Sequence, residues 1–304
     1  MYLQAFACCG IEPRIQFDFP TYRMQVKKMV FLVLRISAIL LGAGALEVRA
    51  HGDDQILIDA LTEELAKAPE ADLFIRRGEL FRHHQEWAKA AADFESAARL
   101  EPKLEIVDFF RARLLLEAGE PVKAQPFIER FLKNSPTEAE GWFLRGDVLG
   151  ALGKYEAGAL DYAEGIGRAP HPRPEHYLRR AKSLAAAPNA DSTRVLAALE
   201  EGIEKLGPVI SLLEYAITLE MEQKNYAGAL ARIEKAMAHS PRRETWLVRQ
   251  GDVLLKSGRT SDAVAAYRAA LAAIEDLPPR YRETVPIEKL ERDARASLDR
   301  ITLD

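Results

Sequence analysis

The sequence predicts an all-α protein, a solenoid of about six helical hairpins with an entry helix before them and a capping helix after them. Three prolines lie 34 residues apart, at Pro102, Pro136 and Pro170, and each closes a segment that reads as two amphipathic helices joined by a short turn. The segment 144–149 recurs almost unchanged as 249–254. Because each unit can bury its apolar face only against its neighbours, a fixed period of this kind decides the whole fold.

Aligned on this period, residues 71–277 divide into six units: 71–104, 105–138, 139–172, 173–208, 209–243 and 244–277. Positions are counted from the first residue of each unit, except that in unit four they are counted from Pro174. Small residues recur at positions 8, 20 and 27, where they let the two helices approach closely, and large residues at positions 4, 11 and 24 fill the space between hairpins. The residues that define the repeat are Gly78, Ala90, Ala97, Pro102, Pro136, Trp142, Gly146, Gly158, Pro170 and Gly251.

This alternation of small and large residues resembles the tetratricopeptide repeat (TPR) family, of the exported type found in bacteria, and the match covers residues 71–277. The resemblance implies a right-handed α-solenoid. It also implies a concave groove lined by positions 2, 5, 9, 12 and 13 of each first helix. The groove residues that it selects are Ile75, Glu79, Arg82, Phe109, Arg113, Phe143, Asp147, Leu178, Lys182 and Asp252.

The composition of this predicted groove favours one kind of ligand. Apolar side chains alternate with charges of both signs, which suits an extended peptide or a helix better than a small charged metabolite. The family's clamp for C-terminal carboxylates needs Lys and Asn at positions 5 and 9, whereas unit one has Ile75 and Glu79 there. The sequence therefore predicts a protein or peptide partner other than a chaperone tail.

Arginine recurs at position 7 of units one to four, as Arg77, Arg111, Arg145 and Arg180. Units one and three also carry aspartate at position 23. We expect charge-assisted pairs within or between the hairpins. The alternative is a row of guanidinium groups that faces an anionic ligand.

Both ends of the array have candidate caps. Residues 51–70 are predicted to hold an entry helix, with Ile56, Ala60, Leu61 and Leu65 at helical spacing. Residues 278–304 are predicted to form a C-terminal capping helix. Its apolar face would comprise Ile287, Leu290, Ala294, Leu298 and Ile301.

Residues 1–50 read as a secretory signal peptide. A basic segment, 24–28, precedes a mostly apolar segment that runs to Leu46, and Val48-Arg49-Ala50 predicts cleavage after Ala50. Arg35 leaves residues 36–46 as the longest uncharged stretch, whereas a spanning helix needs roughly 20 residues. The alternative is an uncleaved anchor. Residues 1–23 precede the basic segment awkwardly, so we expect Met24 or Met29 to be the start.

Charge and cysteine content exclude several classes of protein. The chain carries a net charge of −4, and cleavage would remove six basic and three acidic residues, which brings the charge to −7. Such a chain has no basic excess to neutralise a phosphate backbone, which argues against nucleic acid as its main ligand. Both cysteines, Cys8 and Cys9, precede the predicted cleavage site, so no thiol would remain for a lipid anchor.

The predicted function follows from the repeat and from the motifs that are missing. No nucleophile elbow, phosphate loop, HExxH motif or dinucleotide fingerprint is present, so the sequence predicts neither an enzyme nor a cofactor. We expect an exported scaffold, periplasmic or secreted, that binds a protein or peptide in its groove. The alternative is an envelope copper-binding protein that uses His51 as its mature N-terminus; no other metal ligand is predicted.

Overall fold

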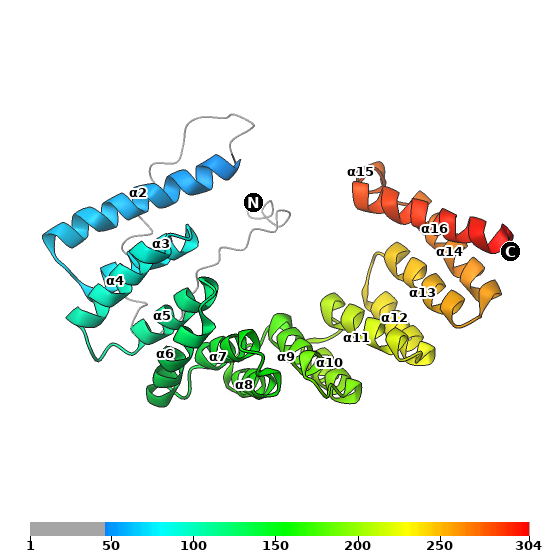
Figure 1. The fold of residues 1–304 in the computed structure, drawn as a ribbon. Helices are drawn as coiled ribbons and strands as arrows, with labels where there is room; N and C mark the ends of the chain where they lie inside the picture. Colours follow the sequence, from blue (N-terminus) through cyan, green and yellow to red (C-terminus); the bar gives the residue numbers. More distant parts are fainter. Residues whose placement is uncertain (1–45, 304) are drawn as a thin grey trace. The chain divides into compact units, whose positions relative to one another are not determined.

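The computed structural model describes residues 46–303, which form fifteen helices and, within that range, no strand (Figure 1). The helices are α2 Leu46–Lys67, α3 Ala71–His83, α4 Trp87–Leu100, α5 Ile106–Glu117, α6 Pro121–Asn134, α7 Ala139–Ala151, α8 Tyr155–Arg168, α9 Pro174–Ala186, α10 Ser192–Leu206, α11 Ile210–Glu222, α12 Tyr226–His239, α13 Glu244–Lys256, α14 Thr260–Glu275, α15 Pro279–Arg282 and α16 Val285–Leu303.

The helices pack pairwise along the chain, and each of the six predicted units contains one pair. The first helices are α3, α5, α7, α9, α11 and α13, and each packs against the second helix that follows it. Each second helix in turn packs against the next first helix, and α16 closes the series against α13 and α14. The all-α array of hairpins is therefore confirmed. It lies within one compact unit, residues 57–304.

Small residues at position 8 explain how the two helices of a hairpin come together. A Cβ atom added to Gly78 would lie 2.6 Å from Cε1 of Phe94, which stands at position 24 of the same unit. A Cβ atom on Gly251 would lie 2.6 Å from Cε1 of Tyr267. Real Cβ atoms do not approach an aromatic ring so closely, so the large residue at position 24 fits only because position 8 is small.

The turn inside the hairpin uses a left-handed residue in units one, two, three, five and six. Position 15 is glycine in units two, three and six, where its φ angle lies between 73° and 79°. In unit one the same position is Gln85, with a φ angle of 59°, and in unit five the turn residue is Lys224, with a φ angle of 60°. A side chain in this region of φ clashes with the backbone, so these two turns are strained.

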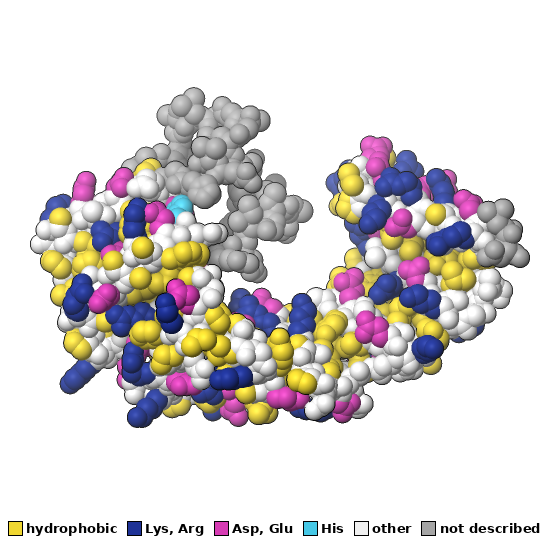
Figure 2. Space-filling view, in the orientation of Figure 1, with side chains coloured by type: hydrophobic (Ala, Val, Ile, Leu, Met, Phe, Trp, Pro, Cys, Tyr) yellow, Lys and Arg dark blue, Asp and Glu magenta, His cyan; other side chains and the backbone are white. Residues whose placement is uncertain are grey.

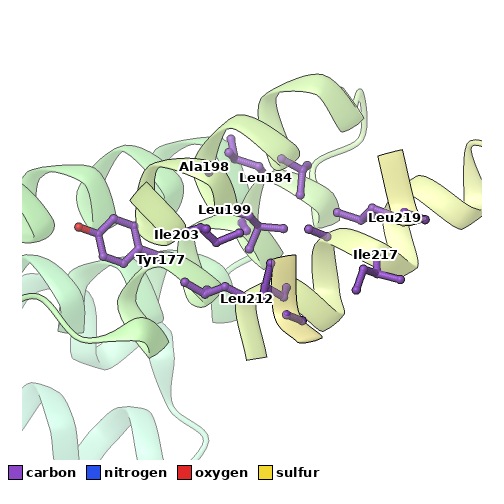
Figure 3. Packing of buried hydrophobic residues seen from close by; sticks show 14 of the residues in the cluster. Tyr177, Leu184, Ala198, Leu199, Ile203, Leu212, Ile217 and Leu219 are labelled. Atoms are coloured by element: carbon purple, nitrogen blue, oxygen red, sulfur yellow. The ribbon is translucent and has the colours of Figure 1, made fainter. Parts of the chain in front are cut away.

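The hydrophobic core runs through consecutive hairpins. Around α9, α10 and α11, apolar side chains interdigitate into a densely packed cluster (Figure 3). Tyr177, Leu199 and Leu212 are fully buried there. A second cluster joins α3 to α7, and a third joins α13 and α14 to α16. Each cluster contains side chains from more than one hairpin, so the hairpins bury their apolar faces against their neighbours, as expected of stacked repeats.

The two ends of the array differ in how well the sequence predicted them. In α16, Ile287 and Ala294 are buried and Leu290, Leu298 and Ile301 pack beside them, so the predicted apolar face is confirmed. In α2, Leu61 and Leu65 are buried, but Ile56 is 67% exposed, Ala60 is exposed as well, and Ile58 is buried. The prediction for Ile56 was wrong because the buried stripe follows Ile58, Leu61 and Leu65, and a residue two places before Ile58 points elsewhere.

The predicted signal peptide falls almost entirely on residues 1–45, which lie outside the described residues. The predicted cleavage site, after Ala50, falls within α2, and cleavage there stays a prediction. Within residues 46–303, no helix combines the length and the apolar character needed to cross a bilayer.

Candidate partner-binding surface

The apolar residues predicted to line the groove belong to the core. Ile75, Phe109 and Phe143 are only 7%, 5% and 3% exposed. Leu178 is partly buried against the central cluster. Phe143 also packs into the space that Gly165 leaves open, where an added Cβ would lie 2.4 Å from the phenyl Cε1. Position 5 is therefore a packing position in these units.

The charged groove residues of units one and two form one ion-pair cluster. Glu79 accepts a hydrogen bond from Arg82 Nε at 2.9 Å and pairs with Arg113 of the next unit. Arg82 Nη1 reaches Oε2 of Glu117 at 2.5 Å. Two carboxylates and two guanidinium groups thus neutralise one another across the junction between α3 and α5. The cluster connects two hairpins and leaves no net charge for a ligand.

Asp147 connects unit three to unit four. Its carboxylate accepts a hydrogen bond from the Tyr162 hydroxyl at 2.6 Å and one from Arg179 Nη1 at 2.9 Å. Burial raises the pKa of the Asp147 carboxyl, while these two donors oppose that shift. Burial also raises the pKa of Tyr162, and the neighbouring Asp147 raises it further. The phenol therefore stays protonated and keeps donating.

Unit six repeats this contact. Asp252 accepts a hydrogen bond from the Tyr267 hydroxyl at 2.8 Å, and burial together with that bond raises the pKa of Tyr267 to about 12. Sequence reasoning placed both aspartates in the groove and missed that each is held by the tyrosine at position 24. The signal was present, because units three and six alone combine aspartate at position 9 with tyrosine at position 24.

The arginines at position 7 are engaged within their hairpins. Arg77 donates to Asp93 at 2.7 and 2.8 Å, and Arg145 donates to Asp161 at 2.6 and 2.7 Å. Arg180 reaches Glu201 at 2.6 Å. Arg111, whose unit has a phenylalanine at position 23, lies 5.5 Å above that ring. The predicted charge-assisted pairs are confirmed for units one and three, and the guanidinium groups are not arrayed for an anion.

A cleft of about 440 Å³ opens between α11, α13 and α16. Its apolar lining comes from Trp246, Val248 and Leu290. Its polar lining includes Glu214, Thr218, Thr245, Arg249, Asp252, Asp293 and Ser297. Arg249 Nη2 donates to the Thr218 hydroxyl at 3.2 Å, so the cleft holds one guanidinium group beside three carboxylates. We call it the first-helix cleft, because Thr245, Val248 and Asp252 stand at groove positions 2, 5 and 9.

The rest of this surface is of mixed character. Lys182 is exposed, and Figure 2 shows basic and acidic side chains interspersed with apolar ones over the face in view. Within the described part of the chain, no three His, Cys, Asp or Glu side chains come together as a metal site. The side chain of His51 lies outside the described residues, so the copper-binding alternative stays a prediction.

Comparison with known proteins identifies the repeat. The family model of the tetratricopeptide repeat matches residues 111–171, which include unit three up to residue 171, and residues 216–278, which include unit six. The chain therefore contains tetratricopeptide repeats in these two stretches. The tetratricopeptide repeat is a scaffold module without catalytic chemistry, and nothing in these repeats assigns a catalytic activity to the chain. No curated protein matches it.

Solved structures show the same fold. A tetratricopeptide repeat protein from Parabacteroides merdae is 19% identical, with a TM-score of 0.50 over 83% of this chain and 96% of that one. The C-terminal part of a TPR repeat-containing protein from Cytophaga hutchinsonii is 13% identical, with a TM-score of 0.54 over 74% of this chain and 93% of that one. At these identities the likeness establishes the architecture alone.

Proposed function

We propose that this TPR protein is an exported scaffold that holds a protein or peptide partner in the first-helix cleft. The observation that carries the proposal is the cleft itself, with an apolar lining from Trp246, Val248 and Leu290 and a charged lining around it. Recognition sites for peptides combine apolar contact area with a few polar groups that fix orientation. The ion-pair clusters elsewhere on the first helices are satisfied internally, whereas no ion pair joins Glu214 or Asp293 to another described residue.

Export is the second part of the proposal. It is supported by the basic, apolar and small-residue segments of residues 24–50 and by the lack of cysteine after residue 50. Mass spectrometry of the protein recovered from cell fractions tests it. We expect a mature chain that begins at His51 in the envelope or the medium, and a full-length chain in the cytosol would contradict export.

Charge reversal tests the cleft. In Glu214→Lys/Asp293→Lys, two carboxylates of the lining become cations, and both residues are exposed, so we expect the fold to persist. The matched control is Glu101→Lys/Glu204→Lys, which makes the same charge change at exposed residues outside the cleft. Partners recovered from an envelope extract by the wild type and the control should be missing with the cleft variant. Recovery of the same partners by all three proteins would contradict the proposal.

A further inference from the structure

A second cleft, of about 350 Å³, lies between α12, α13 and α14 and shares no residue with the first-helix cleft. Its apolar lining includes Leu230, Leu247 and Leu254, with three alanines of α14. Glu234 of α12 and Gln250 of α13 contribute polar groups. Arg259 and Asp262 also line it, but they pair with each other at 2.7 Å. We call this space the unit-six cleft.

Unit three shows what fills the equivalent space elsewhere in the array. There, position 7 is Arg145, whose guanidinium group lies 4.6 Å above the ring of Trp142 at position 4 and pairs with Asp161 at position 23. The Asp161 hydrogen bond raises the pKa of Arg145, and the charge of Glu129, on the preceding α6, adds to that shift. In unit three this space is therefore filled by the Arg145 side chain, which lies on the ring of Trp142 and has the carboxylates of Asp161 and Glu129 near its guanidinium group.

Unit six keeps the surroundings and lacks the occupant. Position 7 is Gln250, position 23 is Ala266, and position 4 is Leu247. Glu234 stands eight residues after the start of α12, as Glu129 stands eight residues after the start of α6. Glu234 is exposed and forms no ion pair with another described residue. The apolar walls and the Glu234 carboxylate, unpaired among the described residues, remain, but unit six has no arginine at position 7 to lie between them, and the Arg259 guanidinium group is already paired with Asp262.

We propose that the unit-six cleft binds an arginine side chain supplied by a partner protein. The aliphatic stem would lie along Leu247 and Leu254, as long basic side chains do on apolar surface. The guanidinium group would donate to the Glu234 carboxylate and to the Gln250 amide oxygen, which together replace the carboxylates that Arg145 finds in unit three. This site is separate from the first-helix cleft, and the two can be tested independently.

The probe for the test is N-acetyl-arginine methylamide, titrated into the full chain and followed by backbone amide chemical shifts. Saturable shifts should appear at Leu247, Gln250 and Ala266 and not at their unit-three counterparts, where Arg145 already fills the space. The citrulline analogue has nearly the same shape without the charge, so it should bind about fivefold more weakly, because an exposed ion pair contributes modestly. Equal binding of the two probes, or shifts confined to other units, would overturn the proposal.

Two variants separate the site from general charge effects. Glu234→Gln should weaken arginine binding to the level of citrulline, whereas the control Glu204→Gln should leave it unchanged. Gln250→Arg/Ala266→Asp rebuilds the unit-three pair in unit six and should abolish the saturable shifts. Undiminished binding by Glu234→Gln refutes the site even if the double variant fails to fold.

Discussion

Units three and six use the same contacts inside the hairpin and differ at its surface. Each places a tyrosine at position 24 against the glycine at position 8, and each binds the tyrosine hydroxyl to the aspartate at position 9, at 2.6 Å in unit three and 2.8 Å in unit six. Unit three then adds the ion pair between Arg145 and Asp161, which unit six lacks. Units three and six thus share the packing inside the hairpin. Positions 7 and 23 differ, because they form an ion pair in unit three and line a cleft in unit six.

The largest expected effect comes from the shared interior. Gly251→Leu forces a side chain against the ring of Tyr267 and should lower the free energy of unfolding by about 3 kcal/mol. Gly146→Leu should cost less, because its Cβ would lie 3.1 Å from the Tyr162 ring. Gly167 of α8 has open space around its Cβ position, so Gly167→Leu is the matched control. Urea unfolding measures all three, and equal losses would contradict the packing account.

A titratable contact joins unit three to unit four. His176 is 3% exposed and stacks on Phe143 with ring centroids 3.8 Å apart, and its Nδ1 accepts a hydrogen bond from the Arg173 backbone N–H at 3.3 Å. Burial lowers the pKa of His176 from 6.5 to about 4. The folded protein keeps this histidine neutral, so stability should fall as pH falls from 6.5 towards 4, where the unfolded chain takes up a proton first.

The expected loss between pH 7 and pH 4.5 is about 2 kcal/mol from this group. Urea unfolding at the two pH values measures it in the wild type and in His176→Phe, which keeps a stacked ring and removes the titration. The variant should lose less stability on acidification than the wild type. An exposed histidine, changed in His171→Gln, serves as the control. The same pH dependence in all three proteins would count against a buried neutral imidazole.

Converting unit three towards unit six tests the surface difference. Arg145→Gln leaves Asp161, which is nearly buried, without its partner and should cost about 2 kcal/mol. The double variant Arg145→Gln/Asp161→Ala removes both charges and should cost about 1 kcal/mol, less than the single change. Thermal and urea unfolding give the comparison. A double variant that is less stable than the single variant would show that the cost of Arg145→Gln does not come from leaving the Asp161 carboxylate unpaired.

The smallest effect concerns the turn inside the hairpin. Units three and six have glycine at the left-handed position 15, whereas unit one has Gln85. Gln85→Gly should raise the free energy of unfolding by about 0.5 to 1 kcal/mol by relieving that strain, and Gly153→Gln should lower it by about 1 kcal/mol. Urea unfolding should show changes of opposite sign in the free energy of unfolding of the two variants. A loss of stability in both variants would contradict a left-handed residue at position 15.

Sequence reasoning reached the hairpins because their signal is local. Small residues such as Gly78 and Gly146 recur at one period, and close packing of two helices demands them. It failed where a side chain's direction depends on the neighbouring hairpin, so Phe109 and Phe143 were assigned to the groove and prove to be core residues. The first-helix cleft was out of reach altogether, because α16 forms one of its walls and no repeat position says where a capping helix will lie.

The central claim, that the first-helix cleft holds a protein partner, is tested most directly by photo-crosslinking in cells. A photoreactive side chain at Thr245, which is exposed and lines the cleft, should capture a partner in an adduct of discrete mass. The same group at Glu204, exposed on α10 and outside the cleft, should capture none. Adducts from both positions, or none from Thr245, would contradict the account.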